Sequence, residues 1–203
     1  MTRYRSYNAL PDQPEGTSEI RDRIIAAATQ LFEEHGFRKT SIDAITRDAR
    51  TSKRTVYEYF PDKHAILSVV LAQFIRQRFT ELERMKAQDS GLPPRDVLRH
   101  LAQGLSDVAR DGESKAMYRL LLAEADHVPD IARASHDIGL QQVVELVHKP
   151  LSALGIGDAE MAAQIFYDVF VMAPLNRALV GVEPMPINVD VALDALLDGF
   201  SRT

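Results

Sequence analysis

Cations, hydroxyl groups and aromatic rings gather in one short stretch of the chain, TSKRTVYEYF at residues 51–60. Lysine and arginine neutralise phosphate, and hydroxyl or phenol groups donate hydrogen bonds to it. On a helix through this stretch Val56 lies on the inward face, whereas Lys53 and Tyr57 lie outside. The pattern predicts a helix that binds nucleic acid. The alternative is a solvated helix face on which one ring, that of Tyr59, is partly buried.

The net charge of −5 hides an uneven distribution of charged residues. Residues 38–63 hold seven Lys or Arg against four acids, whereas residues 65–203 hold 13 against 19. A phosphate-binding face needs only local positive potential. The local excess therefore permits nucleic-acid binding in an acidic chain, although an imbalance of this size also arises by chance.

The residues around the candidate helix predict three helices within positions 19–64, of roughly 16, 9 and 9 residues with very short connections. Gly36 supplies a left-handed stop for the first helix. Thr40, followed by Asp43, resembles a capping box at the start of the second. Pro61 cannot continue the third helix. The two short helices and their tight turn form a helix-turn-helix, a motif that places an α-helix in the major groove of DNA.

These residues resemble the tetracycline-repressor (TetR) family of bacterial transcriptional regulators. The resemblance covers residues 20–71 and rests on AA-x-x-LF-x-x-x-GF from Ala27 to Phe37 and on S-K-x-T-x-Y-x-Y-F-x-x-K from Ser52 to Lys63. It implies that side chains or helix ends around the helix-turn-helix contact DNA bases or phosphates. The residues concerned are Thr40, Ser41, Thr51, Ser52, Lys53, Arg54, Thr55, Tyr57, Tyr59 and Lys63.

Two positions depart from the family pattern. Arg50 stands in the turn where family members usually have glycine, so the turn can be set differently. Arg54 stands where glycine is also frequent, and its bidentate guanidinium is expected to read a guanine. The alternative for Arg54 is a contact to phosphate.

We predict an all-α protein of about nine helices. Residues 1–18 form a flexible N-terminal tail, residues 19–64 the helix-turn-helix domain, and residues 65–203 a helical domain. The family resemblance implies that this last domain binds a small effector and dimerises. RLLLAEADHVPDIA, residues 119–132, resembles one subset of the family's ligand-binding domains.

Two helices expected at residues 158–180 and 188–200 carry extensive apolar surface. The first is apolar nearly all round, and such a helix is covered on two sides; Pro174 is expected to kink it. Pairing both helices with their symmetry mates would form a dimer whose recognition helices lie about 34 Å apart, one turn of DNA. The alternative is burial inside one subunit. Candidate interface residues are Met161, Ile165, Val169, Met172, Leu193, Leu196, Leu197 and Phe200.

Polar or bulky side chains on apolar helix faces are candidates for effector binding. They are His100, Met117, Tyr118, Leu121, Glu124, His127, Phe166, Tyr167, Phe170 and Asn176. Glu124 could meet a cationic or hydroxyl-bearing ligand. The alternative is a buried carboxylate satisfied by a nearby arginine, Arg99 or Arg119.

Catalytic and metal chemistry find little support in the sequence. The chain has no cysteine, which excludes disulfides, thiolate nucleophiles and cysteine-based zinc sites. Glu124-x-x-His127 and Glu145-x-x-His148 repeat the spacing of di-iron bundles, but Glu145 falls on the polar side of its helix, so a di-metal protein is a remote alternative. No Ser-His-Asp set, phosphate loop or nucleotide fingerprint is present. We therefore expect no enzyme, no metal and no cofactor.

Hydropathy indicates a protein of the cytoplasm. Hydrophobic residues make up 45% of the chain and charged residues 26%, which is ordinary for a globular protein. The longest nearly apolar run, residues 65–75, is shorter than the roughly 20 residues that span a bilayer. The N-terminal residues lack the apolar core of a signal peptide.

The sequence thus predicts a homodimeric transcriptional regulator, more precisely a repressor, that binds a palindromic operator in double-stranded DNA. A small apolar or amphipathic effector would release it. The alternative is a regulator of the same fold that has no small-molecule ligand and is controlled by a protein partner.

Overall fold

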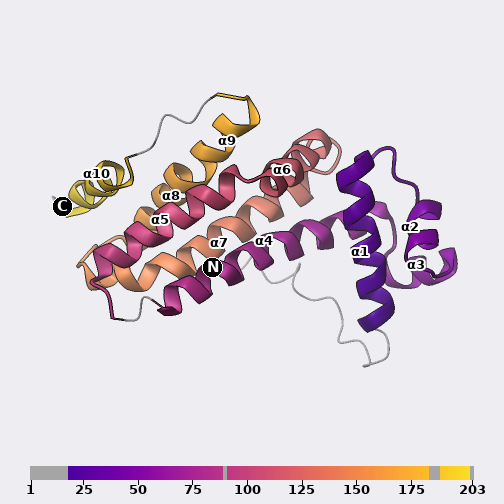
Figure 1. Ribbon diagram of the computed structural model, residues 1–203, viewed down its shortest axis with the longest axis horizontal. Helices are drawn as coiled ribbons and strands as arrows, with labels where there is room; N and C mark the ends of the chain where they lie inside the picture. Colours follow the sequence, from indigo (N-terminus) through magenta and orange to yellow (C-terminus); the bar gives the residue numbers. More distant parts are fainter. Residues whose placement is uncertain (1–17, 89–90, 183–187, 202–203) are drawn as a thin grey trace. The chain divides into compact units, whose positions relative to one another are not determined.

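The computed structural model describes residues 18–88, 91–182 and 188–201, and the regular secondary structure in those ranges is entirely helical (Figure 1). The all-α prediction is confirmed. The elements are α1 (Ser18–His35), α2 (Ile42–Asp48), α3 (Lys53–Tyr59), α4 (Lys63–Gln88), α5 (Pro94–Arg110), α6 (Gly112–Glu124), α7 (Pro129–Ala153), α8 (Ala159–Tyr167), the π-helical turn η1 (Asp168–Met172), α9 (Ala173–Leu179) and α10 (Val189–Ser201). Counted as one interrupted helix, α8, η1 and α9 bring the described helices to the nine expected. The predicted tail, apart from Ser18, lies outside the described residues.

The chain forms two compact units. Unit 1 comprises Met1–Gln73 and Leu120–Ser135, and unit 2 comprises Phe74–Arg119 and His136–Thr203. Helices α4, α6 and α7 therefore each contribute residues to both units. The predicted boundary at residue 64 assigned residues 120–135 to the C-terminal domain, whereas in the structure they pack with the N-terminal helices.

Capping residues set the ends of the short helices in unit 1. Gly36 stops α1 with a φ of 79°, as predicted. Ser41, not Thr40, is the N-cap of α2, and its Oγ accepts a hydrogen bond from the amide of Ala44 at 3.1 Å. The capping box predicted at Thr40 was wrong by one residue. Ser52 caps α3 in the same way, with 3.0 Å to the amide of Thr55.

The core of unit 1 is built where the helical periodicity placed apolar side chains. Ile24, Phe32, Ile45, Val56 and Phe60 are each at most 2% exposed. Both short helices pack against α1 and against each other. This shared core holds α3 at a fixed angle and leaves its opposite face to solvent.

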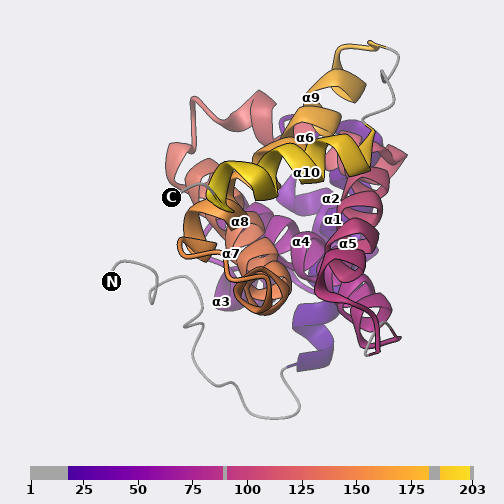
Figure 2. The same cartoon turned by 90° about the vertical axis from the view of Figure 1, so that its left-hand side faces the viewer.

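Unit 2 has its own apolar core, made by residues of α4, α5, α7, α8, η1 and α10. The last helix, α10, packs against α5 and α8 (Figure 2). Near Pro174 the α-helix is interrupted, because the π-helical turn η1 ends at Met172, immediately before α9. Proline lacks an N–H and crowds the preceding turn, and a π-bulge relieves both effects.

Within the described ranges no helix combines the length and the apolar character needed to cross a bilayer.

Candidate nucleic-acid interface

The turn between α2 and α3 closes with an arginine in the left-handed conformation. Arg50 has a φ of 51°, the one positive φ among the described non-glycine residues. The amide of Arg50 bonds the carbonyl of Arg47 at 3.1 Å, and that of Thr51 bonds the carbonyl of Thr46 at 3.0 Å. These two hydrogen bonds define a Schellman motif, in which glycine usually takes the position of Arg50. The turn therefore has the geometry of a glycine turn without the glycine.

The outer face of α3 presents the residues that drew attention in the sequence. Exposed residues here are Ser52, Lys53, Arg54 and Tyr57. Tyr57 is unusual among them because this large aromatic residue is 48% exposed. Thr55 and Tyr59 on α3 are half-buried, as is Thr51, which precedes the N-cap of the helix. A short helix with an exposed face of cations, hydroxyls and a phenol suits a groove lined with phosphates.

Carboxylates hold both cations of α3 in the structure. Lys53 Nζ lies 3.0 Å from Asp43 on α2, and Arg54 Nε lies 3.0 Å from Glu58 one turn further along α3. The hydrogen bond and the charge of Asp43 raise the pKa of Lys53 above its ordinary value, so the ammonium stays charged. Any contact of these cations with DNA would compete with the carboxylates.

Two predicted DNA contacts are corrected, because their polar atoms serve the protein's own backbone. The side chain of Thr40 is buried and its hydroxyl donates to the carbonyls of Leu31, at 3.1 Å, and Gly36, at 2.9 Å. Lys63 Nζ donates to the carbonyls of Phe37, at 2.6 Å, and Thr40, at 2.8 Å. The neighbouring Ser41 is exposed at the start of α2 and remains a candidate.

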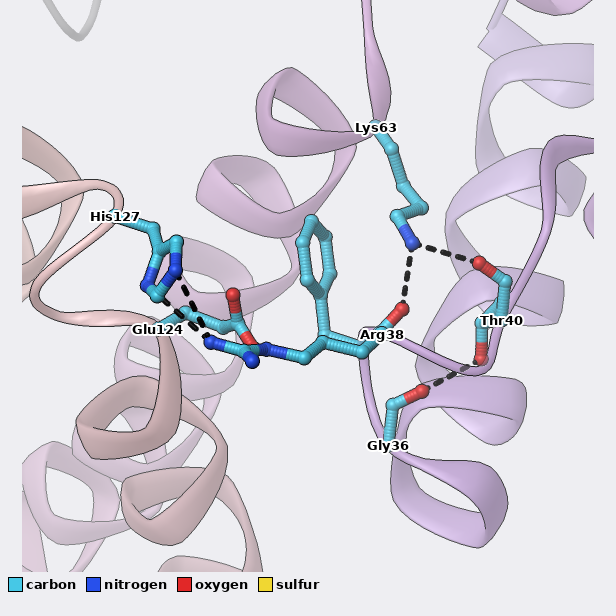
Figure 3. A network of polar contacts seen from close by, with 7 residues as sticks. Gly36, Arg38, Thr40, Lys63, Glu124 and His127 are labelled. Atoms are coloured by element: carbon cyan, nitrogen blue, oxygen red, sulfur yellow. Dashed lines mark hydrogen bonds and ion pairs between the residues drawn. The ribbon is translucent and has the colours of Figure 1, made fainter.

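A polar cluster that the sequence analysis did not foresee joins α6 to the loop after α1 (Figure 3). Arg38 Nε donates to Glu124 Oε1 at 3.0 Å, and its Nη2 lies 3.2 Å from a ring nitrogen of His127. Glu124 is thus a buried carboxylate satisfied by an arginine, but the arginine is neither Arg99 nor Arg119. The signal in the sequence was weak, because 86 residues separate the two partners.

Other candidates for effector binding divide into buried and exposed residues. Buried side chains are Met117, Leu121, Phe166, Tyr167 and Phe170. Tyr118 is half-buried, whereas His100, His127 and Asn176 are exposed.

The buried candidates of unit 2 centre on aromatic rings. Phe166 and Phe170 have ring centroids 4.6 Å apart, and the ring of His136 meets Tyr167 edge-on at 5.3 Å. Burial raises the pKa of Tyr118 and, more strongly, that of Tyr167, so both phenols stay protonated. Phe166, Tyr167 and Phe170 form part of the apolar core of unit 2.

The candidate dimer residues differ in their exposure to solvent. Met161 and Ile165, one turn apart on α8, are 47% and 38% exposed. Val169, Met172 and Phe200 are half-buried. Leu193, Leu196 and Leu197 are buried in the core of their own subunit, which is the alternative weighed for α10. They are therefore removed from the candidate interface, because α5 and α8 already cover them.

The E-x-x-H pairs do not assemble into a metal site. Glu124 and His127 both contact Arg38, a cation, while Glu145 and His148 are exposed. No three His, Cys, Asp or Glu side chains among the described residues are grouped so that they could hold a metal ion.

An N-terminal and a C-terminal segment of the chain each match a known protein family. Residues 24–70 match the model of bacterial regulatory proteins of the tetR family, and residues 96–196 match the C-terminal domain of AefR-like transcriptional repressors. The chain belongs to the TetR family. The resemblance seen in the sequence is confirmed, and the second match extends it over most of the chain.

Solved structures of this family share the fold along nearly the whole length. A TetR-family regulator from Mesorhizobium loti is 26% identical with a TM-score of 0.73, covering 94% of this chain and 98% of that one. FadR of Thermus thermophilus, a repressor solved in complex with lauroyl-CoA, is 25% identical with a TM-score of 0.61, covering 89% and 93%.

Curated relatives match a shorter segment. HbdR of Aromatoleum sp. (strain CIB), an HTH-type transcriptional regulator, is 36% identical over 84 residues, which is 41% of this chain and 37% of HbdR. The chain thus matches little more than a third of the length of that relative.

Proposed function

We propose that this TetR-family protein is a DNA-binding transcriptional repressor that binds a palindromic operator as a homodimer and is released by a small amphipathic effector. The observation that carries the proposal is the exposed face of α3, with Ser52, Lys53, Arg54 and Tyr57 held on a helix-turn-helix core. The match to AefR-like repressors supports repression rather than activation.

Selection of bound sequences from a random DNA pool tests the DNA-binding part. The wild-type protein should enrich one palindrome, and Lys53→Ala and Tyr57→Ala should each lose it. Lys149→Ala is the matched control, because Lys149 is an exposed cation on α7 in unit 2. Failure of the wild type to enrich any sequence at low salt, where phosphate contacts are strongest, would refute the proposal.

The exposed apolar pair on α8 supports the homodimer. Contiguous exposed apolar patches mark interaction surfaces, and these two neighbouring side chains would form part of such a patch. Ile165→Lys should therefore yield a monomer in light scattering after gel filtration. Gln164→Lys, at the adjacent exposed position, should leave the dimer intact. A dimer that survives Ile165→Lys would move the interface elsewhere.

The amphipathic effector is supported by the aromatic and phenolic residues of unit 2 and by lauroyl-CoA bound to the structurally similar FadR. Titration of the protein–operator complex with lauroyl-CoA, and with coenzyme A as the control, tests the class of ligand. Release by the acylated form alone is expected. Release by neither would favour control by a protein partner.

A further inference from the structure

The loop between α1 and α2, residues 36–40, is held by charged side chains from two different helices (Figure 3). From α4, Lys63 donates to the carbonyls of Phe37 and Thr40, and its Nζ lies 4.2 Å from the centre of the Phe37 ring. From α6, Glu124 accepts a hydrogen bond from Arg38. The loop is thus fixed through its backbone on one side and through an ion pair on the other.

Glu124 is the anchored member of the ion pair. Its side chain is 5% exposed, whereas that of Arg38 is 63% exposed. A buried carboxylate without a partner is strongly unfavourable, so Glu124 requires a cation at this place. Burial lowers the pKa of Lys63, and the charge of Glu124, at longer range than a direct contact, partly opposes this lowering. Arg38 supplies the direct contact, and its position follows that of Glu124.

The ring of His127 supports the same guanidinium from the turn that follows α6. Both ring nitrogens lie within 3.3 Å of Arg38 Nη2. Arg38 therefore contacts two groups from the end of α6 and the following turn, which fixes the direction of its side chain as well as its charge.

The helices that hold the loop also extend into unit 2. Residues 63–73 of α4 and 120–124 of α6 belong to unit 1, and the remainder of each helix belongs to unit 2. On the other side, the loop leads directly into Ser41, the N-cap of α2, and so into the helix-turn-helix. A shift of α6 along its axis would move Glu124, and with it Arg38 and the start of α2.

We propose that Glu124 and Arg38 are positioning residues for the DNA-reading helices: the ion pair sets the placement of α2 and α3 according to the position of α6. This inference rests on the proposed function, because it presumes an operator to be read. It assigns Glu124 to the transmission of a signal and not to contact with the effector.

The competing role for Arg38 is a direct contact to a DNA phosphate. The two roles predict opposite changes in DNA affinity when Glu124 is replaced. Replacing Glu124 by Gln removes a negative charge, so a purely electrostatic effect would strengthen DNA binding. A positioning role predicts weaker operator binding from the same change. The two roles also differ in the salt dependence of Arg38→Met, because loss of a phosphate contact lowers the salt slope by about 1 whereas misplacement does not.

The experiment measures affinity for the selected operator and for a random duplex by fluorescence anisotropy at several salt concentrations, together with the thermal midpoint. Full-length wild type, Glu124→Gln, Arg38→Met and the double variant are compared. Lys39→Met is the matched control, because Lys39 is exposed on the same loop. We expect each single variant to lose about 5–50-fold in operator affinity, within the range of typical coupling between sites. The double variant should lose no more than either single one, and random-duplex affinity should stay within about 2-fold for Glu124→Gln.

Several outcomes would overturn the proposal. Unchanged or increased operator affinity in Glu124→Gln would do so, as would independent losses that multiply in the double variant. If Arg38→Met, which leaves the buried Glu124 carboxylate without its cation, fails to fold, the operator affinity of Glu124→Gln decides alone, because that change removes the charge that needs a partner. A wild-type protein that binds no operator would refute the proposed function instead, so the two failures are distinguishable.

Discussion

Replacing Arg50 tests the unusual turn between α2 and α3. At a φ of 51° a residue with a Cβ pays about 1–2 kcal/mol, whereas glycine pays nothing for that conformation. Glycine in turn loses more backbone freedom on folding, by about 0.5–1 kcal/mol. Arg50→Gly should therefore be more stable than Arg50→Ala by about 0.5–1 kcal/mol. The alanine variant is the proper reference because both changes remove the same charge and side chain.

The reverse substitution, from glycine to alanine, at a second left-handed position serves as the control. Gly155 follows α7 with a φ of 76°, and the amide of Ile156 bonds the carbonyl of Leu151 at 3.3 Å, as in the turn at Arg50. A Cβ added at Gly155 would meet no heavy atom within 4 Å, so its cost is conformational only. Gly155→Ala should destabilise the protein by about the amount that separates Arg50→Gly from Arg50→Ala.

The assay is urea unfolding followed by far-ultraviolet circular dichroism, with thermal scans at matched concentration. For a chain of this size 1 kcal/mol corresponds to a shift of about 2–4 °C in the midpoint. If Arg50→Gly proved no more stable than Arg50→Ala, while Gly155→Ala behaved as expected, Arg50 would not hold a left-handed turn.

The remaining predictions concern single buried or surface groups. Thr40→Val should destabilise the protein by about 1–2 kcal/mol in urea unfolding, because the buried hydroxyl proton shared between the Leu31 and Gly36 carbonyls is lost; an unchanged midpoint would contradict those hydrogen bonds. Gly139→Ala should stabilise by about 1 kcal/mol only in a Tyr167→Phe background, since the added Cβ would lie 3.0 Å from the Tyr167 hydroxyl in the wild type; equal effects in both backgrounds would disprove the clash. Because burial raises the pKa of Tyr167, the folded chain keeps a proton that the unfolded chain loses above pH about 10, so stability should fall there, and less steeply in Tyr167→Phe. Glu58→Gln should raise affinity for any duplex several-fold at low salt by freeing Arg54, with the gain vanishing at high salt; a gain that persists at high salt would point to a base contact.

Local patterns in the sequence predicted the helices and most of their ends. The stop at Gly36 and the inward face of Val56 depend on neighbouring residues in the chain, and the structure bears them out. The one-residue error at Thr40 has a physical cause. Threonine and serine are both good caps, and the choice depended on whether the Thr40 hydroxyl could bond the end of α1 instead.

The partners of charged groups were not predictable from local patterns. Lys63 was assigned to DNA, yet its ammonium binds two carbonyls that precede it by 23 and 26 residues. Leu193 and its neighbours were assigned to a dimer interface, yet α5 and α8 cover them. An apolar stripe shows that a helix face is buried but does not show which surface buries it.

By itself the sequence determined the all-helical fold, the helix-turn-helix and the family, because these follow from helical periodicity, capping residues and a motif within about 50 consecutive residues. Only the tertiary structure decided what Glu124 does. Its partner Arg38 lies 86 positions earlier in the chain, and no periodicity links two residues that distant. Burial made the pairing necessary, since an ionised carboxylate inside a protein requires a cation, but folding alone determined which cation lies within reach.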